Sequence, residues 1–278
     1  MLNLINFQLV IIGSCKMKVF TVILFCFLAA LQDRVAAHND EETRVELPWL
    51  VHLRYSCLTL RGRLNSCVGT LYNNRWIITA ASCLSELNID NSLIESRYIW
   101  VRYDAPNVFR PGFVTETTKL KIHPEYDYKT GANNIGLIDI DRDIEFTDKI
   151  QPIALAASDA EVPENGLVCG YGEKDGEPGE DLLCVNVTLS EADGLLVAQS
   201  INNATKYDFG AALVSEGKVH GILVRSADEN SAGAFLSTSK YVAWIEEETA
   251  EKEPEPEEEK ISIVDGDDVL IAEPILTF

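Results

Sequence analysis

The order of apolar and polar residues predicts a chain built mainly of β-strands. Within residues 67–83, CVGTLYNNRWIITAASC, the apolar and β-branched run Trp76–Thr79 leads into two small residues, Ala80 and Ala81. Such a run, bounded by turn-forming residues, predicts a buried strand that ends in a tight turn. Comparable runs occur at residues 48–53, 98–103, 113–114, 121–126, 133–138, 167–172 and 182–187.

Two of these runs predict a hairpin in the second half of the chain. Residues 167–172 and 182–187 both alternate in polarity and flank a loop rich in Gly, Asp and Glu. Cys169 and Cys184 fall where cross-strand neighbours would lie, so we expect them to form a disulfide.

The N-terminus has the pattern of a secretory signal peptide. Met17 and Lys18 precede an apolar run, residues 19–31, and small residues lead to a cleavage site after Ala37. Residues 1–37 are therefore assigned as the signal peptide, with Met17 as an alternative start, and residues 38–45 as a short segment after it. The alternative is a membrane anchor, but the apolar run is short for a span of about 20 residues.

The cysteine count follows from this assignment. The chain has seven cysteines, two of which, Cys15 and Cys26, lie in the segment that would be removed. An oxidising compartment favours disulfides among the remaining five. An odd number leaves one over, and Cys57 is the expected unpaired cysteine, either free or in an intermolecular bond.

Charge separates the end of the chain from its body. The formal net charge of the 278 residues is −21, and the segment between Glu246 and Phe278 contains 13 acidic residues and two lysines. Residues 250–278 are predicted to be an acidic, disordered tail, or else a docking segment, because apolar triplets interrupt the acidic residues. This balance argues against nucleic acid as a partner, since phosphate binding needs clustered positive charge.

Several motifs together resemble the chymotrypsin/trypsin-like serine protease family (peptidase S1). The stretch 67–83 resembles the segment C-G-G-T-L to L-T-A-A-H-C, and the family spacing implies a Cys67–Cys83 disulfide. The other landmarks, in family order, are residues 48–53, 121–126, 133–138, 148–153, 167–172, 203–214, 220–226, 233–235 and 241–245. The resemblance covers about residues 46–249. It implies an all-β fold of two six-stranded antiparallel Greek-key β-barrels with a short C-terminal helix, the second barrel being shortened.

Catalysis in this family needs a serine activated by a histidine that a buried carboxylate orients. The matching positions in this sequence are Ser82 for the histidine, Asn134 for the aspartate and Phe209 for the serine. The activation motif, an arginine followed by I-V-G-G, is also missing before Pro48. The resemblance therefore implies a catalytically dead protein, and no cofactor or metal site is expected from any sequence motif.

The residues around the former site also depart from the family. Tyr207 replaces the glycine beside the oxyanion hole, and Asn203 stands at the floor of the specificity pocket. Arg225 and Ser226 replace the tryptophan and glycine of the pocket wall. Asp208 is retained without its ammonium partner, so we expect it to accept backbone N–H bonds, to meet Lys206 or to reach solvent. Two N-glycosylation sequons begin at Asn186 and Asn203.

Together these features predict a secreted, extracellular serine protease homologue that acts by binding and does not touch a membrane after signal cleavage. Inactive members of the family that resemble this chain are abundant in insects, where they modulate proteolytic cascades in immunity or act in reproduction. The expected partner is an extracellular protein, either a cascade protease or its substrate. The alternative is a decoy that sequesters protease substrates or inhibitors.

Overall fold

A computed structural model describes residues 46–56, 64–87, 93–95, 98–198, 204–227 and 232–250. The predicted signal peptide, the short segment after it and the acidic tail lie outside these residues. So do Cys57 and Asn203, and the assignments made for all of them stay predictions.

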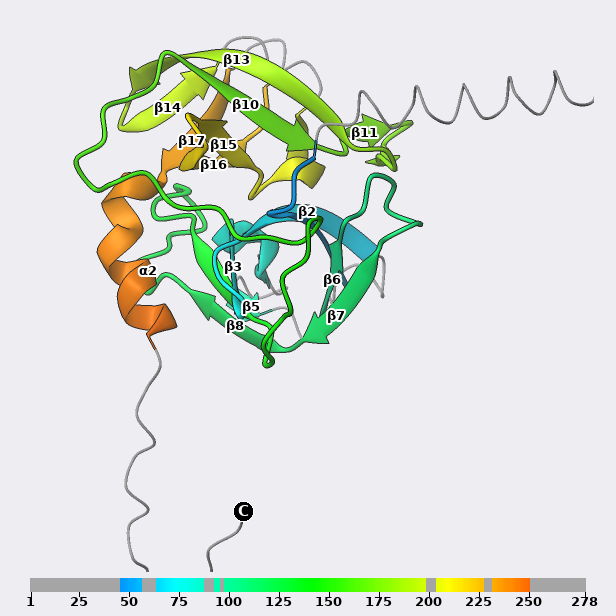
Figure 1. Ribbon diagram of the computed structural model, residues 1–278. Helices are drawn as coiled ribbons and strands as arrows, with labels where there is room; N and C mark the ends of the chain where they lie inside the picture. Colours follow the sequence, from blue (N-terminus) through cyan, green and yellow to red (C-terminus); the bar gives the residue numbers. More distant parts are fainter. Residues whose placement is uncertain are drawn as a thin grey trace, which may run out of the picture.

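Two β bodies lie against each other, with one helix at their side (Figure 1). The first body is a curled seven-stranded antiparallel sheet in the order β7-β6-β1-β2-β3-β9-β8. Its strands are β1 (Leu50–Ser56), β2 (Leu64–Leu71), β3 (Trp76–Thr79), β6 (Ile99–Tyr103), β7 (Phe113–Thr117), β8 (Lys119–Ile122) and β9 (Gly136–Asp139).

The second body is a closed six-stranded barrel in the order β10-β13-β14-β17-β16-β15. Its strands are β10 (Asn165–Gly170), β13 (Leu183–Ala192), β14 (Leu195–Ala198), β15 (Ala212–Ser215), β16 (Lys218–Arg225) and β17 (Gly233–Ser237). The remaining elements are β4 (Ser85–Leu87), β5 (Leu93–Glu95), β11 (Glu173–Lys174), β12 (Glu177–Pro178), the 3₁₀ turns η1 (Ala81–Cys83), η2 (Lys206–Asp208) and η3 (Thr238–Tyr241), and helix α2 (Val242–Thr249).

The expected all-β, trypsin-like fold class is confirmed. The first body differs from the expectation in detail, because it is a curled sheet of seven strands. The two edge strands of its sheet, β7 and β8, are consecutive in the chain and are separated only by Thr118. They act as one bent strand whose halves pair with opposite neighbours, β6 and β9. The Thr117 hydroxyl stabilises the bend by donating to the Asp139 carbonyl at 2.7 Å. The sheet therefore curls at this bend, but its two edge strands do not pair with each other to close a barrel.

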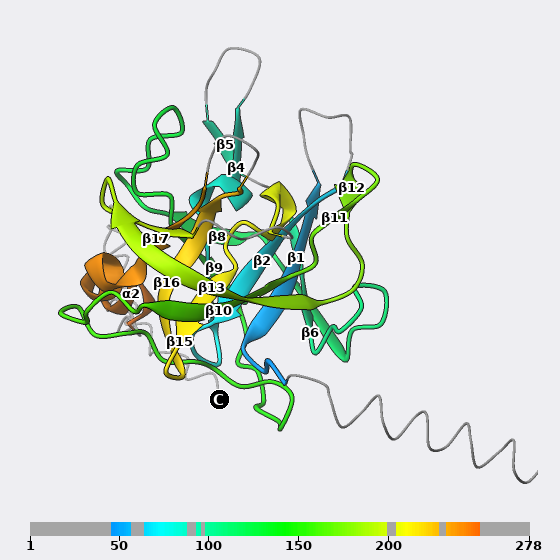
Figure 2. The same cartoon turned by 90° about the horizontal axis from the view of Figure 1, so that it is seen from above.

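Alternation along β1 sets the position of the core. Val51, Leu53 and Tyr55 are buried inside the first body, while His52 and Arg54 point to the other face of the sheet. Successive side chains of a strand point to opposite faces of the sheet, and on β1 both faces are covered, the inner one by the core of the first body and the other, at Leu50 and His52, by residues of the second body. A second cluster joins the two bodies, because Leu50 and Val68 of the first pack with residues of the barrel. In the view from above, β10 and β13 cross β1 and β2 (Figure 2).

Both expected disulfides are present. Cys67 on β2 is bonded to Cys83 in η1, and Cys169 on β10 is bonded to Cys184 on β13. The second pair joins directly opposed residues of the β10–β13 ladder, which is the cross-strand placement expected from the hairpin. No helix in the described part of the chain is long and apolar enough to cross a membrane.

Gly210 lies where the two bodies meet and has no room for a side chain. Its φ is +85°, and a Cβ atom would lie 2.1 Å from Thr79 Oγ1 and 2.2 Å from the Val68 carbonyl oxygen. We predict that Gly210→Ala lowers the free energy of unfolding by about 3 kcal/mol or more, because neither the Val68 backbone nor the buried Thr79 hydroxyl bonded to it can give way cheaply.

Gly217→Ala is the matched control. Gly217 has a φ of +71°, but a Cβ atom added there would meet no other atom within 4 Å, so only the backbone cost of about 1 kcal/mol is expected. Urea denaturation of both variants measures the difference. Equal losses would show that the close approach at Gly210 is not a constraint.

Candidate functional site

Ser82 and Asn134 are brought together at the end of β3. Ser82 lies in η1, and Asn134 lies two residues before β9, the strand that pairs with β3. The Ser82 backbone N–H donates to Asn134 Oδ1 at 2.8 Å, and the amide Nδ2 donates to Ser82 Oγ at 3.2 Å. The two side chains therefore satisfy each other, and Asn134 is 5% exposed.

Phe209 reaches the same region from the second body. It follows η2, and its carbonyl oxygen accepts the Val68 N–H of β2 at 3.0 Å and lies 3.4 Å from the Cys83 sulfur. Its ring is partly buried and packs against the core clusters of both bodies. The ring thus serves as a contact between the bodies.

The chemistry of these three residues is limited. A serine hydroxyl and a carboxamide do not exchange protons near neutral pH, and a phenyl ring has no nucleophilic atom. The assignment of the three residues to the base, carboxylate and nucleophile positions comes from the sequence and stays a prediction. The structure adds that Ser82 and Asn134 contact each other and that Phe209 adjoins η1 through its backbone.

Asp208 is the most completely bonded carboxylate of this region. Its Oδ1 accepts the backbone N–H groups of Tyr171 at 2.7 Å and Gly172 at 3.0 Å. Its Oδ2 accepts the N–H of Thr205 at 2.8 Å and the Thr205 hydroxyl at 3.1 Å. Burial raises the pKa of Asp208, and these donors oppose the rise. Of the three expectations for this residue, bonding to backbone N–H groups is the one observed.

The side chains beside Asp208 are also occupied. Lys206 lies 3.8 Å from Glu173 and above the Tyr207 ring, so it does not pair with Asp208. Tyr207 is buried, and its hydroxyl donates to the Gly176 carbonyl at 2.9 Å, between β11 and β12. Arg225 is exposed and donates to the Ala232 carbonyl at 3.3 Å. Asn186, the described sequon residue, is exposed on β13.

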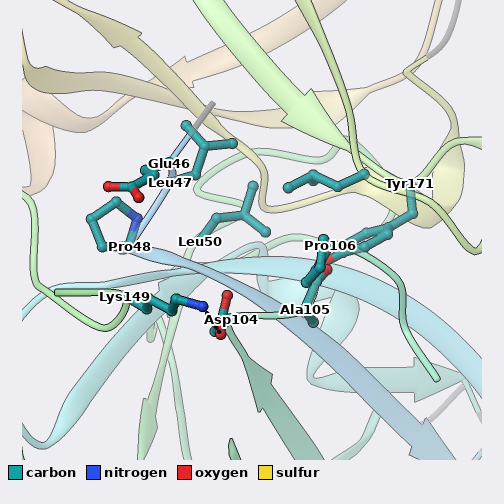
Figure 3. A pocket seen from close by; sticks show the side chains of 10 residues that line it. Glu46, Leu47, Pro48, Leu50, Asp104, Ala105, Pro106, Lys149 and Tyr171 are labelled. Atoms are coloured by element: carbon teal, nitrogen blue, oxygen red, sulfur yellow. Dashed lines mark hydrogen bonds and ion pairs between the residues drawn. The ribbon is translucent and has the colours of Figure 1, made fainter. Parts of the chain in front are cut away.

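A cavity of about 80 Å³ lies away from these residues, where the N-terminal segment enters the body (Figure 3). It is bounded by residues that precede and begin β1, by the loop after β6 and by Tyr171. Lys149 and Asp104 face each other across it at 3.7 Å. None of Ser82, Asn134 and Phe209 lines this cavity, so it is separate from the positions that the family resemblance assigns to catalysis.

His52 is a buried residue whose setting is not evident from the sequence. It is 1% exposed, its ring meets the Tyr171 ring edge-on at 4.9 Å, and neither ring nitrogen has a hydrogen-bond partner. Burial, with Arg102 and Arg54 nearby, lowers the pKa of His52 to about 3. The sequence signal that could have found it is a histidine at an outward position of β1 beside an arginine. In the described part of the chain, no cluster of side chains suited to a metal is found.

Comparison with known proteins places the chain in a family. The trypsin family model matches residues 37–245, so the chain belongs to the trypsin family. It is 29% identical over 202 residues to the inactive serine protease scarface of Drosophila melanogaster, covering 68% of this chain and 29% of that protein. The chain thus spans about three tenths of the length of that relative.

Two further comparisons agree with this assignment. Trypsin II-P29 of Gallus gallus is 26% identical over 271 residues, covering 84% of this chain and 99% of that protein. Among solved structures, a scabies mite inactivated protease paralogue superimposes with a TM-score of 0.61 at 20% identity. That superposition covers 72% of this chain and 94% of the other, and it supports the fold alone.

The depressed pKa of His52 predicts a loss of stability in acid. Histidine in the unfolded chain binds a proton below about pH 6.5, whereas His52 in the folded chain does so only near pH 3. The unfolded state therefore binds more protons across this window, and stability falls as the pH drops through it. We expect His52 to account for about 2 kcal/mol of lost unfolding free energy between pH 7.5 and pH 5.

Urea denaturation of the His52→Gln variant at both pH values tests this expectation. The variant should lose less stability than the wild type on acidification. His220→Gln is the control, because His220 is partly exposed and its removal should change the pH dependence much less. An unchanged slope in His52→Gln would contradict the buried neutral state of His52.

Proposed function

We propose that this chain is a non-catalytic member of the trypsin family that acts by binding another protein. The observation that carries the proposal is the reciprocal hydrogen bonding of Ser82 with Asn134, next to a Phe209 ring that packs into both bodies. These residues supply neither a base nor a nucleophile where the family resemblance puts both. The description of the relative scarface as an inactive serine protease supports the same reading.

The proposed setting is extracellular. Two disulfides within the described residues favour an oxidising compartment, and the predicted signal peptide would deliver the chain there. The exposed sequon at Asn186 would then be a glycan site. The partner we propose is a protease of an extracellular proteolytic cascade, or its substrate, with the chain acting as a cofactor or modulator in immunity or reproduction.

A decoy that presents a substrate-shaped groove is the weaker candidate. Tyr207 fills space toward Gly176, and Phe209 is committed to packing, so both reduce the room for a substrate chain. Binding of a serpin or a peptide inhibitor would favour the decoy. Binding of an intact cascade protease without inhibitor binding would favour the modulator.

We predict that purified mature protein does not cleave a diverse peptide library and is not labelled by a fluorophosphonate probe. The single variant Phe209→Ser should stay unlabelled as well, because Ser82 and Asn134 offer its new hydroxyl no base. An active trypsin is the positive control. Cleavage by the wild type that is lost on mutation within residues 46–249 would refute the proposal.

Affinity capture with the mature protein from its native fluid, followed by mass spectrometry, tests the binding role. We expect recovery of an extracellular protease or protease substrate at stoichiometric levels. A heat-unfolded sample of the same protein is the control for non-specific capture. Recovery of protease inhibitors alone would contradict the modulator role and favour the decoy role.

A further inference from the structure

The outer face of the first sheet contains a group of cationic and polar side chains on three neighbouring strands. His52 and Arg54 come from β1, and their direct cross-strand partners on β6 are Arg102 and Trp100. Ser66 on β2 lies opposite Arg54 on the other side. Residues at these register positions lie about 5 Å apart on one face. We call this group the arginine face: His52, Arg54, Ser66, Trp100 and Arg102.

The arginine face has hydrogen-bonding atoms without partners. Five buried side-chain nitrogen and oxygen atoms in the described residues lack a partner, and four of them belong to His52, Ser66 and Arg102. Buried polar atoms are nearly always bonded in folded proteins, and a guanidinium N–H left alone is costly. The guanidinium group of Arg102 is a donor only, so the group that suits this face is an acceptor. His52 and Ser66 are buried, so a chain that docks from outside would meet the partly exposed side chains of Arg54, Trp100 and Arg102.

Within the described residues, the arginines also lack counter-charges. Neither Arg54 nor Arg102 forms an ion pair with a described acidic side chain. Burial, followed by the like charge of nearby Arg54, lowers the pKa of Arg102. Glu116 on β7, the ladder partner of Trp100, interacts with Tyr98. In a chain of net charge −21, two uncompensated arginines on one face call for an anionic ligand.

Apolar surface borders these arginines. The Tyr98 and Trp100 rings contact edge-on at 4.8 Å, and Val114, the β7 partner of Arg102, is 44% exposed. Arginines flanked by aromatic and aliphatic surface fit a peptide that carries both carboxylates and apolar side chains, in which the arginine forks bind the carboxylates. A ligand with charge alone would leave the apolar border unused.

The chain itself contains such a peptide. Residues 251–278 hold ten acidic residues, two lysines and three apolar stretches at 261–264, 269–271 and 275–276. They begin just beyond α2, whose residue Glu248 bonds Lys121 of the edge strand β8. Because β8 and β7 are consecutive, only β7 separates that edge from the arginine face on β6. Twenty-eight residues extend up to about 90 Å, so the reach is ample.

We propose that the C-terminal segment 251–278 docks on the arginine face of its own chain, with carboxylates on Arg54 and Arg102 and apolar side chains on Trp100 and Val114. Tethering favours this occupant over an external acidic protein. A segment attached to the same chain has an effective concentration in the millimolar range, whereas an external anionic partner would be repelled by the net charge of the chain. The inference is independent of the proposed function, since it concerns a contact within the chain.

Limited proteolysis of the full-length mature protein tests the proposal, because the segment contains two lysines, Lys252 and Lys260. A lysine-specific endoproteinase should cut slowly at these two sites in the wild type. In the double variant Arg54→Gln/Arg102→Gln, the rate of cleavage should rise at least tenfold. The matched control is Arg142→Gln/Lys218→Gln, which removes two exposed cations outside the arginine face and should leave the rate unchanged.

Hydrogen exchange of the same proteins provides a second readout that does not depend on cleavage. The backbone amides of β6 and of residues 251–278 should exchange more slowly in the wild type than in the double variant. The amides of the core strand β3 should exchange equally slowly in both proteins. This last observation excludes unfolding as the cause. The loss of protection should also appear on adding 0.5 M salt, because the contact is largely ionic.

Three outcomes would overturn the proposal. Equal cleavage rates in the wild type and the double variant would show that the segment does not use the arginine face. If the protection of residues 251–278 from cleavage and exchange rises with protein concentration, the arginine face binds the C-terminal segment of a second copy of the chain. Rapid tail cleavage combined with arginine-dependent binding of a sulfated polysaccharide such as heparin would assign it to an external polyanion.

Discussion

The arrangement of the two β bodies depends on the buried carboxylate of Asp208. Its four hydrogen bonds join the segment after β10 to the turn η2. This turn fixes the position of the next two residues, so that the Phe209 carbonyl meets β2 and Gly210 passes within contact distance of Thr79 and Val68. A charged group that is buried at such a cost is tolerated because every lone pair has a donor.

The same carboxylate connects the site to the rest of the interface through Tyr171. The Tyr171 N–H binds Asp208, its hydroxyl donates to the Ala105 carbonyl at 2.7 Å, and its ring meets His52. Tyr171 therefore touches the turn η2, the loop after β6 and the outer face of β1 at once. Of the residues that the sequence assigns to the catalytic positions, Ser82 and Asn134 hold η1 to the chain before β9 within the first body, and Phe209 packs against the cores of both bodies.

The strands and the hairpin disulfide could be predicted from the sequence, because each depends on residues that are close together along the chain. Alternation in residues 48–53 and the opposed cysteines of the β10–β13 hairpin specify strands and a disulfide from neighbouring residues alone. The curl of the first sheet is not evident from the sequence, because the bend at Thr118 depends on a bond to Asp139, 22 residues away from Thr117. For Asp208, three partners are compatible with the sequence. Only the approach of Tyr171 and Gly172, more than 30 residues earlier, selects among them.

The arginine face, in contrast, could not be predicted from the sequence. Arg54 and Arg102 are 48 positions apart, and each alone is an ordinary solvent-facing residue of a strand. Only the β1–β6 register makes them neighbours and places His52 between an arginine and a tyrosine ring. Two neighbouring arginines and a buried, unbonded imidazole are unfavourable in isolation, and an acceptor that met the arginines would offset part of this cost. For this member of the trypsin family we therefore propose a face of the first sheet as a binding surface, while Ser82, Asn134 and Phe209 are engaged in hydrogen bonds and packing.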